Sequence, residues 1–197
     1  MVCTARPELL ERRPAWGGGK RNALTASLAP LSDDDTARLV GDLLAGKLVR
    51  TERQSELLAR AGGNPLYAEE YVRMLAQPGA EEELPLPDSV HGIIAARLDM
   101  LPPDEKAVVQ DASIVGKVFW AGGVAALGGL EEEAVQEPLR MLERKEFVRR
   151  ERRSSVAGEI AYVFRHALVR DVAYGQIPRA LRAGKHRLAA AWIESLT

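Results

Sequence analysis

The chain has 197 residues, 46% of them apolar, and its 27 basic side chains nearly balance its 28 acidic ones. This composition suits one compact domain or two small ones, and it excludes a strongly basic nucleic-acid binder by overall charge, although not a local basic patch. Cys3 is the one cysteine, which excludes an internal disulfide framework. No apolar run approaches the roughly 20 residues that cross a bilayer, and the first residues lack the pattern of a secretion signal. We therefore expect a cytoplasmic protein with no membrane association.

The N-terminal segment predicts a short buried strand. Residues 1–5 have its pattern, and Pro7 ends it at Arg6 because proline restricts the residue before it. A lone strand of this length needs neighbours. We therefore expect the rest of the sheet to lie upstream, with the sequence cut from a longer protein. Alternating apolar residues allow a second short strand over residues 24–31.

Helical patterns dominate the remainder. Ser32 with Asp35, and Thr51 with Gln54, are capping boxes that open two helices. A third helix starts after Asn64. Later helices are predicted over residues 88–101, 103–115, 121–127, 131–146 and 165–176, and from Pro178 to the end.

Two further features divide this helical region. Residues 78–87 are rich in Pro and Glu and indicate a solvated linker. Residues 147–153 and 159–164 predict the two strands of a hairpin. Helices followed by such a hairpin are in the order of a winged-helix domain.

A glycine-rich segment, residues 17–20, suggests a phosphate loop only at first sight. A P-loop needs a glycine five residues before its Gly-Lys pair, where this chain has Pro14. It also needs a Ser or Thr after the lysine to bind magnesium, where this chain has Arg21. We interpret this segment as a flexible loop and expect no ATP hydrolysis by this chain alone. The histidines have no metal-ligand spacing, so we expect no metal site; they are His91, His166 and His186.

The stretch from Glu143 to Arg153 carries six basic and three acidic residues and could contact a phosphate backbone. The helix in the recognition position begins with three glutamates, residues 131–133, which would repel DNA. A solvated charged face is the preferred interpretation, and nucleic-acid contact through Arg149 to Arg153 is the alternative.

Four segments together carry a family resemblance. They are Met1-Val2-Cys3-Thr4-Ala5-Arg6, Leu28-Ala29-Pro30-Leu31-Ser32-Asp33-Asp34, Gly63-Asn64-Pro65-Leu66 and Arg165-His166-Ala167-Leu168-Val169-Arg170-Asp171-Val172-Ala173. In this order they resemble the sensor-1 strand, the entry to the lid, the Gly-x-Pro-Leu motif and the histidine motif of signal-transduction ATPases of the STAND/NB-ARC type. The style of the sequence is similar to bacterial multidomain ATPases linked to adenylate or guanylate cyclases or to LuxR-type regulators.

The resemblance implies a mainly α fold in five parts. Residues 1–31 would be the last part of a P-loop α/β core with a remnant strand, 32–77 a helical lid, 78–87 the linker, 88–176 a winged-helix domain and 178–197 the first helix of a repeat region. The partners would be an upstream P-loop core, downstream helical repeats and a cyclase or DNA-binding output domain.

The resemblance also implies ligand-facing residues. Arg6 would reach the terminal phosphate as a sensor-1-like catalytic residue, but only together with the upstream core. Gly63 and Pro65 would lie at the adenine, and His166 would contact the β-phosphate of ADP; the family often has Asp after this histidine, where this chain has Ala167. ATP or ADP with Mg²⁺ would bind the parent protein, and we expect no tight binding to this chain alone.

The implied mechanism is a switch that ADP closes and ATP opens. Two other classes remain open: a free-standing winged-helix DNA-binding protein that uses the wing from Arg149 to Arg153, and a helical protein-interaction module.

Overall fold

The structure is a computed structural model, and it describes residues 2–6, 8–16, 22, 24–44, 51–75 and 87–196, without the side chains of residues 51–53. These residues form ten helices and one small antiparallel sheet, so the described part of the chain is mainly helical. The chain divides into two compact units, Met1–Pro30 and Leu31–Thr197.

The first unit contains α1 (Glu8–Arg12), and the expected strand at its start is wrong. Residues 2–6 and 24–30 have no regular secondary structure and are exposed, with Leu24 and Leu28 94% and 96% accessible. A strand needs a partner for its backbone groups, and the described residues of this unit contain no second strand. The expected remnant strand at residues 1–5 and the second strand over residues 24–31 are therefore both wrong for the described residues.

The second unit opens with three helices, α2 (Asp33–Leu44), α3 (Thr51–Ala61) and α4 (Pro65–Leu75), which we call the first bundle. The capping interaction of Ser32 is confirmed, because its Oγ accepts from the Asp35 backbone N–H at 3.1 Å and donates to the Asp35 carboxylate at 2.7 Å. The side chain of Thr51 lies outside the described residues. α4 packs against both other helices.

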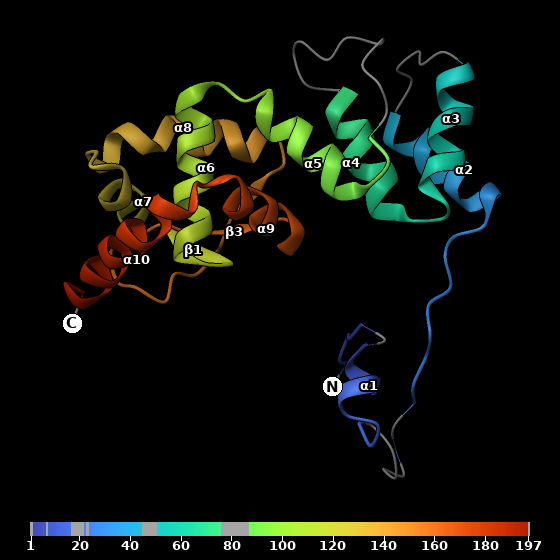
Figure 1. The fold of residues 1–197 in the computed structure, drawn as a ribbon, viewed down its shortest axis with the longest axis horizontal. Helices are drawn as coiled ribbons and strands as arrows, with labels where there is room; N and C mark the ends of the chain where they lie inside the picture. Colours follow the sequence, from blue (N-terminus) through green and yellow to red (C-terminus); the bar gives the residue numbers. More distant parts are fainter. Residues whose placement is uncertain are drawn as a thin grey trace. The chain divides into compact units, whose positions relative to one another are not determined.

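The second bundle combines the remaining helices with the sheet (Figure 1). Its helices are α5 (Val90–Asp99), α6 (Pro103–Val115), α7 (Ala121–Gly128), α8 (Glu132–Arg144), α9 (Ala167–Gln176) and α10 (Arg179–Glu194). Its strands are β1 (Val118–Trp120), β2 (Val148–Arg150) and β3 (Ala161–Phe164), in the order β1-β3-β2. The hairpin of β2 and β3 is confirmed, whereas sequence patterns did not predict β1, which is only three residues long.

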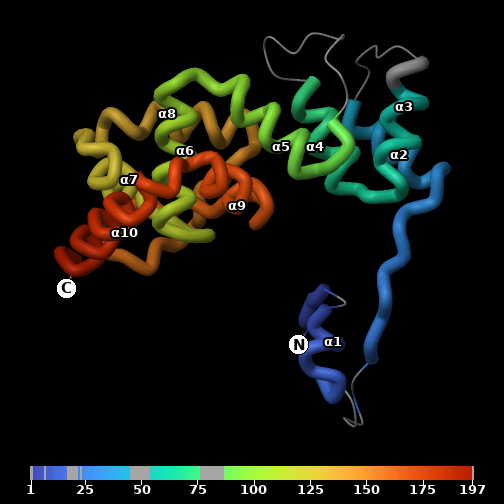
Figure 2. Tube along the Cα trace, viewed as in Figure 1, coloured from blue at the N-terminus to red at the C-terminus, as the bar shows by residue number. Residues whose placement is uncertain are grey.

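α5 belongs to two hydrophobic cores. Its Ile93 joins the core of the first bundle, and its Ile94 and Leu98 join the core between α6, α8, α9 and the sheet. Figure 2 traces α5 between α4 and the helices of the second bundle. The helix thus connects the two bundles by packing as well as by chain continuity.

The linker expected over residues 78–87 lies outside the described residues, except for Pro87, whose carbonyl accepts from the Tyr67 hydroxyl at 2.6 Å. Among the helices of the described ranges, none is both long and apolar enough to cross a membrane.

Candidate functional site

The corner between α3 and α4 carries two of the expected ligand-facing residues. Gly62 and Gly63 have positive φ angles of 51° and 74°, a conformation that glycine adopts at low cost. Asn64 caps α4, since its Oδ1 accepts from the Leu66 N–H at 3.0 Å, and Pro65 is the first residue of the helix. The ring of Pro65 is exposed.

This corner also holds the segment that enters α2. The Leu31 N–H donates to the Gly63 carbonyl at 2.9 Å. Two of the four segments that carry the resemblance therefore meet here, although Leu31 and Gly63 are 32 positions apart in the chain.

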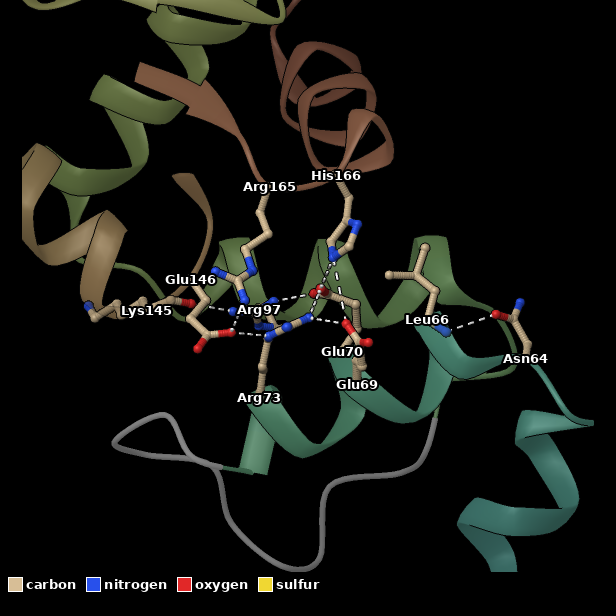
Figure 3. A network of polar contacts seen from close by, with 10 residues as sticks. All are labelled: Asn64, Leu66, Glu69, Glu70, Arg73, Arg97, Lys145, Glu146, Arg165 and His166. Carbon is tan, nitrogen blue, oxygen red and sulfur yellow. Dashed lines mark hydrogen bonds and ion pairs between the residues drawn. The ribbon is translucent and has the colours of Figure 1, made fainter. Parts of the chain in front are cut away.

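His166 lies against α4 from the other bundle. It is the residue immediately before α9 and has an extended backbone. Its Nε2 faces the Glu69 and Glu70 carboxylates at 3.7 Å and 3.9 Å (Figure 3). This nitrogen is buried and has no hydrogen-bond partner among the described residues. His166 thus meets the helix that Pro65 begins, about one turn further along it.

Glu70 and Arg97 form a fully buried ion pair between α4 and α5. Arg97 also donates to the backbone carbonyl of Lys145 at 2.6 Å, and its guanidinium lies 4.3 Å from the centre of the Phe147 ring. Burial lowers the pKa of Arg97, and the Glu70 carboxylate opposes this effect. One guanidinium therefore connects α4, α5 and the end of α8.

Arg73 makes a second set of contacts from the last turn of α4. It donates to Glu69 at 3.1 Å, to Glu70 at 2.8 Å and, through Nε, to Glu146 at 2.5 Å. Burial acts to lower the pKa of Arg73, but its hydrogen bond to Glu146 and the nearby carboxylates raise it overall. Arg165 approaches the same Glu146 oxygen at 3.7 Å.

These contacts define what we call the junction. Its members are Glu69, Glu70, Arg73, Arg97, Glu146, Arg165 and His166. Three carboxylates face three guanidinium groups, so the charges balance while His166 is neutral (Figure 3). Partly buried ion pairs of this kind fix the relative placement of the elements that carry them, which is what the junction can do chemically.

Arg6 belongs to the Met1–Pro30 unit and is described apart from the junction. It lies in irregular chain just before α1, its side chain is exposed, and its carbonyl accepts from the Leu9 N–H at 3.0 Å. The other expected residues, Gly63, Pro65 and His166, belong to the second unit. Pro65 begins α4, and His166 faces Glu69 and Glu70 on the same helix.

The basic segment from Arg149 to Arg153 comprises the end of β2 and the loop that follows it. Arg149 pairs with Glu151 at 3.1 Å, while Arg150, Arg152 and Arg153 are exposed. The loop is fastened by Ser154, whose Oγ accepts from the Trp120 indole N–H at 3.1 Å.

Sequence reasoning missed the charged members of the junction, although two of them left a trace. Glu70 lies between Tyr67 and Met74 on the apolar face of its helix, and Arg97 occupies an apolar-face position of the helix expected over 88–101. A charged residue at a core position needs a partner, which could have suggested that the two meet.

Neither a protein-family model nor a curated protein matches the chain. Within the described residues, no group of three His, Cys, Asp or Glu side chains is placed to hold a metal ion.

Proposed function

We propose that the chain is the regulatory part of a STAND-type signal-transduction ATPase, in which a bound nucleotide gates the contact between a helical lid and a winged-helix domain. The lid would be residues 32–77 and the winged helix residues 88–176. The output would be a linked cyclase or transcription regulator, and hydrolysis would belong to the upstream core of the parent protein.

One observation carries the proposal. His166 and Pro65, which the resemblance assigns to one nucleotide, lie at the same helix: Pro65 begins α4, and His166 faces it across the junction. A ligand that touches both would bridge the two bundles. Differential affinity for the closed and open arrangements would then set their populations.

The chemistry of the residues fits a nucleotide in part. The exposed Pro65 ring is free to pack on a base. The Nε2 of His166 is buried against the Glu69 and Glu70 carboxylates, so a phosphate oxygen would reach it only if these side chains moved. Glu69 and Glu70 would repel that phosphate, but the arginines of the junction already neutralise them. We therefore expect at most weak nucleotide binding by this chain alone.

The test is a titration of the isotope-labelled chain with ADP, followed by nuclear magnetic resonance. Chemical-shift changes are expected at residues 63–66 and 165–168, and His166→Ala should remove them. His91→Ala is the matched control, since His91 is exposed on α5 and lies outside the junction. Shift changes that survive His166→Ala, or ATP turnover by the chain alone, would contradict the proposal.

A free-standing winged-helix DNA-binding protein is the second candidate, favoured by the exposed arginines of the wing. It predicts duplex binding that weakens with salt and is lost when Arg149, Arg150, Arg152 and Arg153 are changed to Glu. The glutamates at the start of α8, residues 131–133, argue against it.

A further inference from the structure

Glu146 has an unusual backbone for its residue type. Its φ angle is 60°, and it is the one residue other than glycine with a positive φ among those the structure describes. It follows the last residues of α8, where its N–H donates to the Glu143 carbonyl and the Phe147 N–H donates to the Leu142 carbonyl, both at 3.0 Å. This is the common left-handed end of a helix, at which glycine is the favoured residue.

A glycine here would relieve the backbone, so the glutamate side chain must compensate for its unfavourable conformation. Its Oε2 lies 2.5 Å from Nε of Arg73 and 3.7 Å from Arg165. The Arg73 contact spans 73 residues of sequence and joins the last turn of α4 to the end of α8. Within the junction, Glu146 is the carboxylate that the second bundle supplies.

The other ion pairs of the junction that involve α4 connect it to itself or to α5. Glu69 and Glu70 lie on α4 with Arg73, so their bonds to Arg73 stay within one helix. The bond from Arg97 to Glu70 attaches the middle of α4 to α5. The bond from Glu146 to Arg73 is thus the described ion pair that attaches the last turn of α4 to the end of α8.

We propose that Glu146 is a positioning residue that fastens the last turn of α4 to the second bundle, and that its left-handed backbone is retained for this contact. The inference deepens the proposed function, because it names the side chain that regulates how firmly the lid is closed. The contact itself involves no nucleotide.

The test compares Glu146→Gln with Glu146→Gly by residue-resolved amide hydrogen exchange, without nucleotide. Glu146→Gln keeps the side-chain length and the left-handed residue but removes the charge. Glu146→Gly removes the side chain and relieves the backbone. Both should raise the exchange rates of residues 71–75 roughly tenfold, the effect of losing about one charge-assisted hydrogen bond.

The two variants should differ at the end of α8. The amides of residues 146 and 147 should exchange more slowly in Glu146→Gly than in Glu146→Gln, because glycine adopts the left-handed conformation at lower cost than glutamine. If Glu146 had only a general structural role, both substitutions would speed up exchange at residues 71–75 and at residues 146 and 147. Glu151→Gln is the matched control: it breaks the ion pair with Arg149 in the wing and should leave residues 71–75 unchanged.

Unchanged exchange at residues 71–75 in both variants would overturn the proposal, as would faster exchange at the end of α8 in Glu146→Gly than in Glu146→Gln. Glu146→Asn is a replacement should one variant not fold, since Asn tolerates the left-handed region and is too short to make the same contact. A negative ADP titration would refute the proposed function and leave this result untouched.

Discussion

Arg97 of α5 donates to the carboxylate of Glu70 on α4, and both side chains are fully buried. The same guanidinium bonds to the Lys145 carbonyl at 2.6 Å. Burial of two charges is costly, and it is tolerated here because each has its counter-charge and further hydrogen bonds. The pair therefore fixes the placement of α4 on α5 more than it adds net stability.

Breaking this pair from one side should destabilise the protein strongly. Glu70→Gln leaves the Arg97 charge buried with a neutral partner, and we expect a loss of about 3 kcal/mol in the free energy of unfolding, measured by urea denaturation. The exposed pair of Glu137 and Arg140 provides the control, because Glu137→Gln should cost less than about 0.5 kcal/mol. Similar losses in the two variants would show that burial of the pair does not matter.

Acid should loosen the contact of Glu146. Burial acts to raise the pKa of Glu146, but the hydrogen bond and charge of Arg73, with Arg165, lower it below the ordinary value of 4.5. A carboxylate with a lowered folded-state pKa stabilises the protein above its unfolded pKa, and this contribution disappears as pH falls through the folded value. The stability difference between the unaltered chain and Glu146→Gln should therefore be constant from pH 7 to about 5 and shrink below pH 4.5. A difference that does not change with pH would contradict this account.

The hydroxyl of Tyr67 should contribute to the stability of the folded protein. The hydroxyl donates to the Pro87 carbonyl at 2.6 Å, and burial raises the pKa of Tyr67 while Arg60 opposes the rise. Tyr67→Phe should cost about 1 kcal/mol at neutral pH, because the carbonyl loses its donor. Since the folded state holds the phenolic proton more tightly, this difference should decrease as pH rises above about 10. Thermal unfolding at pH 7 and pH 10.5 measures both effects; an equal cost at the two values would refute the second.

Asn64 and Pro65, at the corner before α4, should differ in how much they contribute to stability. Asn64→Ala removes the cap from the Leu66 N–H and should cost about 1 kcal/mol. Pro65→Ala should lower the free energy of unfolding by only a few tenths of a kcal/mol. The N–H of the first helical residue has no partner within the helix, so proline and alanine differ little there. Chemical denaturation of both variants tests this order. If the proline proved the more important for stability, its substitution could not be used to probe nucleotide binding.

Local patterns predicted the described helices except α1, because each signal lies within a few residues. The Ser32 cap, the glycines that end α3 and the apolar stripe of α8 all specify structure at short range. The N-terminal strand failed for the opposite reason: a strand requires a partner that its own residues cannot supply. Residues 2–6 accordingly have no regular structure.

The candidate site could be predicted only in outline. The resemblance names Pro65 and His166, but the placement of His166 against α4 depends on how the two bundles pack. The partners of Arg73 illustrate this limit: Glu69 follows from helical spacing, whereas Glu146 lies 73 residues away. No periodicity links these two positions.

The double membership of α5 sets a minimum cost for parting the bundles. Ile93 and Ile94 are neighbours in sequence and about 100° apart around the helix, and each is fully buried in a different core. If α5 stays with one core, the other core loses an isoleucine side chain and is left with a cavity. Exposing one such side chain costs about 1.5–3 kcal/mol. A ligand that parted the bundles would have to supply at least that much binding energy, and the side on which α5 stays would determine which core is exposed.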